Sequence, residues 1–168
     1  MDIFAPPPHL VILQTEHWML NHRVDSALPG YLMLGARRPT NDLWRMPPQA
    51  LAELGALLAR AQAALTATLK PEHLYIGRYG HVPGHALHFH IIPVCAWVKR
   101  RFFSDPRHRN LRTFYQPSGA GDADDATDGA ELTLYVWREF CENPLPPAIS
   151  GPPIDEVIAR LKVFMSPP

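Results

Sequence analysis

Two histidines separated by a single residue, His88 and His90, are the side chains of this chain whose type and spacing best suit chemistry. Side chains two apart on a β-strand share a face, so a strand here would hold two imidazoles side by side. Leu87, Phe89 and Ile91 alternate with them and would face a core. Because imidazole titrates near neutral pH, one ring can attack phosphorus while its neighbour is protonated. The pair therefore suits phosphoryl or nucleotidyl transfer, with both histidines as candidate catalytic residues.

Metal binding is the main chemical alternative for the pair. Zinc and iron sites that take two histidines from one strand need a third ligand. Ile91 and Ile92 stand where a metallo-hydrolase would have Asp and His, and the next glutamate along the chain is Glu131. The sequence therefore predicts no metal site, and two histidines without chemistry remain the other alternative.

Regular patterns around the pair predict the elements that position it. A predicted strand over residues 9–20 precedes a turn with Pro and Gly, so residues 11–36 are interpreted as a hairpin. Two further predicted strands, 74–79 and 86–94, flank a turn rich in Gly and Pro, and the second contains both histidines. Between the hairpin and these strands, residues 47–70 predict a helix, because two prolines suit its first turn and leucines recur at helical spacing. Those leucines are Leu51, Leu54, Leu58, Leu65 and Leu69.

Composition limits the class of protein. The chain has 168 residues, of which 46% are hydrophobic and 19% charged, a balance typical of globular proteins. Its 16 basic residues equal its 16 acidic ones, so no overall charge attracts nucleic acid or an anionic membrane. Cys95 and Cys141 are too few for a disulfide scaffold or an all-cysteine zinc site. Without a leader-like start or an apolar run of about 20 residues, we expect a cytoplasmic protein with no membrane partner.

In the last part of the chain, residues 96–168, basic and acidic residues are concentrated in different segments. Six of the sixteen bases lie within residues 99–112, and we interpret the three at residues 99–101 as a solvated run. Residues 117–128 consist mostly of Gly, Ala and Asp and predict a flexible acidic loop. Residues 132–140 fit either a helix or a strand, and residues 155–165 predict a short terminal helix.

The pattern around the two histidines resembles the motif of the histidine triad (HIT) family, His-φ-His-φ-His-φ-φ, where φ is apolar. Residues 86–93 read Ala-Leu-His-Phe-His-Ile-Ile-Pro. Upstream, residues 28–34 and the Arg38-Pro39 pair are similar to the family's Pro-Gly-(His/Tyr) strand and the turn after it. The resemblance covers roughly residues 10–95 of a single expected domain, residues 1–168, and the remainder matches nothing assignable.

This resemblance implies an α+β fold: an antiparallel sheet of about five strands, one long helix and a C-terminal helical extension. It implies a nucleotide ligand, with His88 as the nucleophile on the α-phosphorus and His90 contacting the phosphate or the leaving group. The implied substrates are dinucleoside polyphosphates, such as diadenosine tetraphosphate, or nucleoside phosphoramidates. The implied reaction needs no cofactor, although Mg²⁺ accompanies many such substrates. The family also implies a homodimer.

The chain departs from the family motif at Ala86, where the first triad histidine would stand. In the family the main-chain carbonyl at this position accepts a bond from Nδ1–H of the nucleophile, and Ala86 retains a carbonyl. The side-chain function is lost, and strand alternation would send the adjacent His85 to the opposite face unless the backbone bulges near Gly84. This departure favours an alternative in which the protein binds or senses nucleotides with little or no turnover.

Further residues are candidates for substrate binding. Asn21 and Asp25 flank the turn of the predicted hairpin, where the family has a polar residue near ribose or phosphate. His81, Arg38 and the Ala86 carbonyl are the other candidates, and each polar side chain among them also fits ordinary turn or surface chemistry. A third class of function, nucleic-acid binding, is suggested by aromatic residues among the bases that follow residue 96, but the zero net charge argues against it. Those aromatic residues are Trp97, Phe102 and Phe103.

Overall fold

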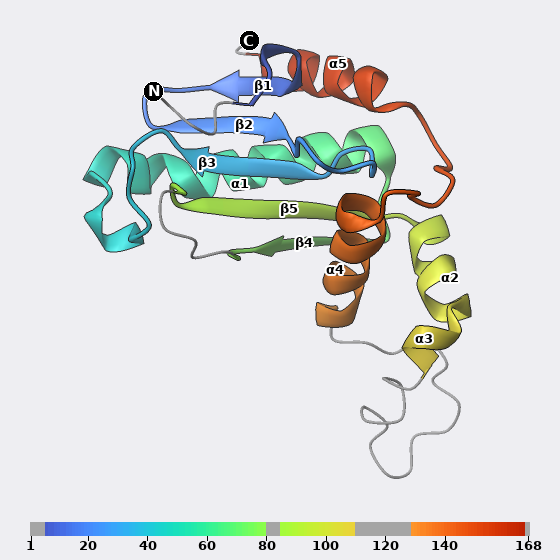
Figure 1. Ribbon diagram of the computed structural model, residues 1–168. Helices are drawn as coiled ribbons and strands as arrows, with labels where there is room; N and C mark the ends of the chain where they lie inside the picture. Colours follow the sequence, from blue (N-terminus) through green and yellow to red (C-terminus); the bar gives the residue numbers. More distant parts are fainter. Residues whose placement is uncertain (1–5, 80–84, 110–128, 167–168) are drawn as a thin grey trace.

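The computed structural model describes residues 6–79, 85–109 and 129–166, and Figure 1 shows their arrangement. Five antiparallel strands form one sheet in the order β1-β2-β3-β5-β4. The predicted α+β fold, with its five-stranded antiparallel sheet, is therefore confirmed. The strands are β1 (Val11–Gln14), β2 (Trp18–His22), β3 (Leu32–Ala36), β4 (His73–Gly77) and β5 (His88–Val94).

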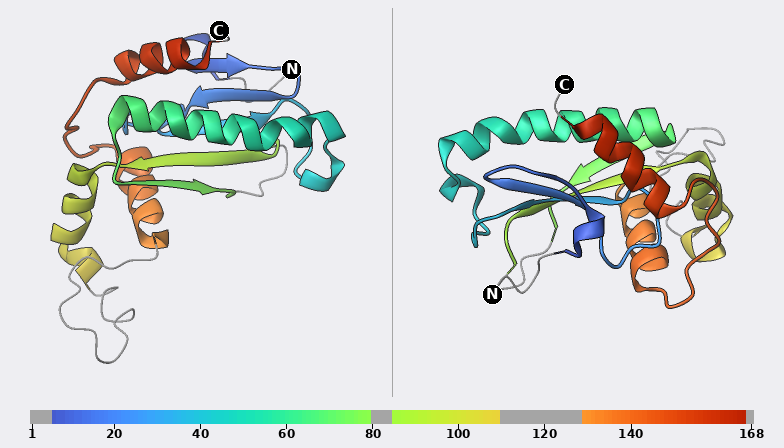
Figure 2. Two further views of the ribbon diagram at one scale, coloured as in Figure 1. Left: turned by 180° about the vertical axis from the view of Figure 1, so that it is seen from behind. Right: turned by 90° about the horizontal axis from the view of Figure 1, so that it is seen from above.

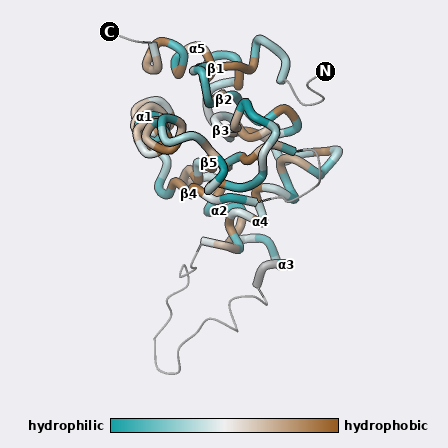
Figure 3. Tube along the Cα trace, turned by 90° about the vertical axis from the view of Figure 1, so that its left-hand side faces the viewer, coloured by the Kyte–Doolittle hydropathy of each residue, from teal (hydrophilic) through white to brown (hydrophobic). Residues whose placement is uncertain are grey.

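One face of the sheet is covered by α1 (Pro48–Leu69), the predicted long helix. Figure 2 shows α1 lying across the strands, and Figure 3 views it nearly end-on beside them. Its buried side includes three alanines, which let the helix approach the sheet closely; Leu51, predicted in this stripe, is 40% exposed. The terminal helix α5 (Ile154–Met165) packs against α1 and β1 and completes this side of the core.

The opposite face is covered only in part by the described helices. Figure 1 shows α4 (Ala130–Trp137) in front of the sheet, and it packs with α2 (Ala96–Ser104). Together they bury an apolar cluster that includes Ile92 and Val94, the last part of β5. The two histidines come earlier on the same strand. Within the described residues, no helix is both long and apolar enough to cross a membrane.

The N-terminal region differs from the predicted hairpin because the expected strand over residues 9–20 is interrupted. A short 3-10 turn, η1 (Pro8–Leu10), comes first, and β1 and β2 are then separated by a turn at residues 15–17. The Thr15 hydroxyl oxygen accepts hydrogen bonds from the backbone N–H groups of His17 at 3.2 Å and Trp18 at 3.0 Å. This turn uses a threonine side chain and contains neither Gly nor Pro, so the usual turn signals are missing.

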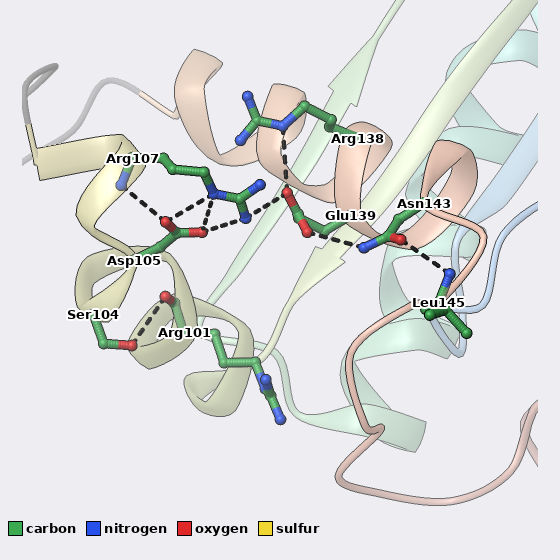
Figure 4. Close-up of polar contacts among 8 residues, drawn as sticks. All are labelled: Arg101, Ser104, Asp105, Arg107, Arg138, Glu139, Asn143 and Leu145. Carbon is green, nitrogen blue, oxygen red and sulfur yellow. Dashed lines mark hydrogen bonds and ion pairs between the residues drawn. The ribbon is translucent and has the colours of Figure 1, made fainter.

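A polar cluster fastens the helical extension together, as Figure 4 shows. Arg107, in the short helix α3 (Pro106–Arg109), donates to Asp105 at 2.6 Å and pairs with Glu139 at 2.8 Å. Glu139 is buried in η4 (Arg138–Glu142), a π-helical turn after α4, and also accepts from Asn143 at 3.3 Å. The described part of the basic segment therefore lies in two helices, where Arg100 and Arg101 of the predicted solvated run are exposed and Arg107 is ion-paired.

Candidate functional site

Strand β5 carries His88 and His90 on one face of the sheet, as the alternation predicts. Their ring centroids lie 5.1 Å apart in an edge-to-face arrangement. Gly35 and Met33 of β3 are their cross-strand partners. Because Gly35 has no side chain, it leaves space beside His88, and the pair lies side by side on the sheet surface.

The orientation of His88 follows from one backbone contact. Its Nδ1 lies 2.8 Å from the carbonyl oxygen of Ala86. A carbonyl oxygen only accepts, so Nδ1 carries the proton and donates, which leaves a lone pair on Nε2. The bond that the family resemblance implies is therefore present although residue 86 is an alanine.

His90 has a different environment, because its Nδ1 lies 2.9 Å from the hydroxyl oxygen of the buried Tyr31. The same oxygen accepts a hydrogen bond from Nη1 of Arg23 at 3.0 Å. Arg23 in turn donates to Asp25 through Nε at 2.5 Å and Nη2 at 3.0 Å. We call these four residues, Asp25, Arg23, Tyr31 and His90, the site relay.

The protonation states within the site relay follow from burial and charge. Burial, the positive charge of Arg23 and the neighbouring His88 lower the pKa of His90 to about 3. Burial raises the pKa of Tyr31 to about 12, and the hydrogen bond from Arg23 lowers the pKa of Asp25. At neutral pH, His90 is therefore a neutral imidazole, which corrects the expectation that the ring beside the nucleophile is protonated.

The predicted binding residues are distributed unevenly around this pair. Asn21 is the cross-strand partner of Met33, and Met33 is the cross-strand partner of His90, so Asn21 lies on the same sheet face as His90. Asn21 is buried, and its side-chain amide donates a hydrogen bond to the His22 carbonyl at 2.7 Å. Asp25 joins the site through Arg23. Arg38 is exposed in the loop after β3, and His81 lies outside the described residues.

Sequence reasoning missed several residues at the site. Arg23 and Tyr31 continue the same-face alternation of β2 and β3 beyond the strand ends, so that alternation was the available signal. Tyr79 folds back over Gly77, where a Cβ atom would meet its hydroxyl at 2.6 Å, and its ring centroid is 5.3 Å from that of His90. The ring centroid of His85 is 6.4 Å from that of His88, and strand alternation does not apply to His85 because residues 85–87 precede β5.

The described part of the chain contains no group of three or more His, Cys, Asp and Glu side chains placed to hold a metal ion. His88 and His90 are thus two imidazoles without a third ligand among these residues. The arrangement offers instead one imidazole nitrogen with a lone pair, one neutral imidazole beside it, and nearby Asn21.

Comparison with known proteins defines the fold. No family model and no curated protein matches the sequence. Among solved structures, a zinc-bound histidine triad family protein from Mycobacterium smegmatis matches with 15% identity and a TM-score of 0.51, over 94% of this chain and 84% of that one. A Plasmodium falciparum diadenosine triphosphate hydrolase, in complex with cyclomarin A, matches with 16% identity and a TM-score of 0.50, over 56% and 67%. The chain therefore has the HIT-like α+β fold.

Proposed function

We propose that this chain is a HIT-type nucleotide hydrolase that forms a covalent nucleotidyl-histidine at His88. The observation that carries the proposal is the hydrogen bond from His88 Nδ1 to the Ala86 carbonyl, which directs the lone pair to Nε2. Imidazole with a free lone pair is a competent nucleophile toward phosphorus. The neutral His90 ring lies beside it, and a HIT-like fold surrounds both.

The proposed reaction has two balanced steps. Nε2 of His88 attacks the α-phosphorus, a P–N bond forms, and the bond from phosphorus to the leaving group breaks with its electron pair. The leaving group departs as an anion or takes a proton from solvent. Water then attacks the same phosphorus and gives up a proton to solvent, the P–N bond breaks with its electron pair returning to Nε2, and a nucleoside monophosphate and a neutral His88 are released. No electron transfer and no metal enter either step.

The proposed substrates are dinucleoside polyphosphates or nucleoside phosphoramidates. The structural neighbour from P. falciparum is named a diadenosine triphosphate hydrolase, which supports this class. Asn21, on the same sheet face as His90, is proposed to contact ribose or phosphate, while Arg38 and His81 remain weaker candidates. Mg²⁺ is proposed only as a companion of the substrate.

The second candidate function is nucleotide binding without turnover. It is favoured by one observation, the alanine at position 86, which supplies a carbonyl but no imidazole. A sensor of this kind would bind a nucleotide on the same face as the hydrolase would. The two candidates therefore differ in turnover and share a ligand.

A metal-free turnover panel tests the proposal. Wild type, His88→Ala and a control, His73→Ala, are incubated in EDTA with diadenosine tetraphosphate and with adenosine phosphoramidate, and products are resolved by HPLC. His73 is exposed at the far end of β4, so its variant should behave as wild type. We expect AMP from wild type and a loss of about three orders of magnitude or more in His88→Ala. AMP binding without any turnover would support the second candidate.

A further inference from the structure

We propose that Tyr31, Arg23 and Asp25 are positioning residues that fix His90 as a neutral hydrogen-bond donor, with its single proton on Nε2. His90 then offers an N–H group to an oxygen of the bound phosphate, beside the Nε2 lone pair of His88. The choice of phosphate as the bound group rests on the proposed function. The fixed tautomer itself rests only on the contacts of the site relay.

The first step of the argument is that Arg23 determines what the Tyr31 oxygen can do. A guanidinium group has only donors. Its Nη1 lies 3.0 Å from the Tyr31 hydroxyl oxygen, which must therefore accept from it. The phenol has one hydrogen left to donate, and its high pKa keeps that hydrogen in place.

The second step assigns the direction of the bond between Tyr31 and His90. If His90 donated from Nδ1, the Tyr31 oxygen would accept twice and its own hydrogen would lack an acceptor. Tyr31 is 1% exposed, and within the described residues its hydroxyl has no other acceptor. A buried hydroxyl hydrogen without an acceptor costs about 1–3 kcal/mol. Tyr31 therefore donates to Nδ1 at 2.9 Å, and the proton of neutral His90 is on Nε2.

The third step explains why the relay starts with an ion pair. Asp25 binds Arg23 through two nitrogens, which fixes the plane of the guanidinium and thus the position of Nη1. Arg23 also lies over the Tyr31 ring, 5.1 Å from its centroid. The charged and titratable groups that face His90 are Arg23, Asp25, His88, Tyr31 and Tyr79. Of these, Arg23 carries the positive charge that disfavours a second proton on His90.

Together these contacts hold two neighbouring histidines in opposite tautomers. His88 donates from Nδ1 to a backbone carbonyl and keeps a lone pair on Nε2, whereas His90 accepts at Nδ1 and keeps a proton on Nε2. The same ring atom is therefore a nucleophile in one residue and a donor in the other. His90 therefore needs no change of protonation state before a phosphate binds.

The direct test is the nitrogen-15 NMR spectrum of the histidine side chains, in which the two neutral tautomers have different shifts. For wild-type protein we expect His90 as the Nε2–H tautomer and His88 as the Nδ1–H tautomer. Tyr31→Phe keeps the ring and removes the donor, so His90 should redistribute toward Nδ1–H. The matched control, Tyr79→Phe, removes the hydroxyl of the other ring beside His90 and should leave its shifts unchanged. Finding His90 as Nδ1–H in wild type, or unchanged in Tyr31→Phe, would overturn the proposal.

A second arm tests the role of Arg23. Arg23→Met removes the charge while keeping the length, and the midpoint of His90 titration should rise toward the ordinary value of 6.5. Arg23→Lys should restore a low midpoint, since it restores the charge. If the midpoint in Arg23→Met stays at the wild-type value, Arg23 does not act on His90. This titration can be read even if the protein turns nothing over, so a failure here is separate from a failure of the proposed hydrolase.

The kinetic arm connects the tautomer to the substrate. In Tyr31→Phe, we expect turnover of diadenosine tetraphosphate to fall about 10-fold to 100-fold. If wild type shows no turnover, the expected result is a weaker affinity for AMP in the variant. An unchanged kcat, KM and AMP affinity would contradict a positioning role.

Discussion

Two clusters of polar side chains in this protein are each built around an arginine paired with a carboxylate, but they have different roles. In the site relay, Arg23 bridges a carboxylate and a buried phenol, and the chain of bonds ends on the His90 ring. In the extension, Arg107 bridges the carboxylates of Asp105 and Glu139, and the bonds end on helix termini. The first cluster thus orients the imidazole ring of His90, whereas the second holds α3 against η4.

The difference comes from the elements that carry the two clusters. The relay residues extend the alternation of β2, β3 and β5, so the sheet register decides that they meet on one face. The second cluster joins α3 to η4 through an ion pair between side chains of short helical segments. Breaking the relay should therefore alter titration and turnover, while breaking the docking cluster should alter stability.

The largest stability effect is expected from Glu139→Ala. Glu139 is 5% exposed, accepts from the half-buried Asn143 and pairs with Arg107, so its removal deprives both donors of their acceptor and leaves space at a buried position. We expect a loss of about 1–3 kcal/mol in the free energy of unfolding, measured by urea denaturation. Glu142→Ala, an exposed glutamate in the same π-helical turn, is the matched control and should be neutral. A change in the His90 tautomer in Glu139→Ala would contradict the separation of the two clusters.

A smaller effect is expected from pH. The folded-state pKa of His90 is about 3, below its ordinary value of 6.5, so the unfolded chain binds a proton that the folded chain does not. The contribution of His90 to the free energy of unfolding is fully present above pH 6.5 and is lost as the pH falls toward 3. Between pH 7.5 and pH 5 this amounts to about 2 kcal/mol.

The variant that isolates this effect is His90→Gln, compared with wild type by urea denaturation at both pH values. Burial also lowers the pKa of His22, but that residue is present in both proteins and cancels in the comparison. The difference between pH 7.5 and pH 5 should shrink in the variant. Identical pH dependence in the two proteins would mean that His90 titrates normally in the folded state.

The smallest effect is expected from Asp25→Asn. Asp25 is 58% exposed, and exposed ion pairs contribute little to stability. The amide oxygen can still accept from Arg23, so the Arg23–Tyr31 bond should persist and turnover should fall by less than about 10-fold. Asp42→Asn, which breaks an exposed pair with Arg45 on η2 (Leu43–Arg45), is the control. A loss of turnover as large as that of Tyr31→Phe would show that the ion pair, rather than the phenol, determines the tautomer of His90.

Particular residues show how much of this could be predicted from the sequence. Alternation around His88 was enough to place both rings on one face, and the prolines and leucines of residues 47–70 were enough for α1. The turn at Thr15 was missed because a side-chain oxygen, with neither Gly nor Pro, makes it. Tyr31 and His90 are 59 positions apart, and their contact depends on the β3–β5 register. The hydrophobic pattern of each strand indicates which side chains share a face, but it does not show that β3 pairs with β5, which lies far along the chain.

The extension was the least predictable region for a related reason. Composition does not show which of its bases form ion pairs, and the contact of Arg107 with the buried Glu139 depends on how α3 and η4 pack. Residues 132–140 fitted a helix and a strand equally, and the structure makes them α4 and part of η4. The predicted acidic loop over residues 117–128 lies outside the described residues and stays a prediction.

The central claim is that Nε2 of His88 is the nucleophile and His90 its neutral partner. The most direct measurement is to mix the protein with diadenosine tetraphosphate, stop the reaction within milliseconds in base, which preserves P–N bonds, and map the adduct by mass spectrometry. The account predicts a single nucleoside monophosphate on His88, still formed but more slowly in Tyr31→Phe. An adduct on His90 or His85, or turnover with no protein adduct in wild type, would contradict it.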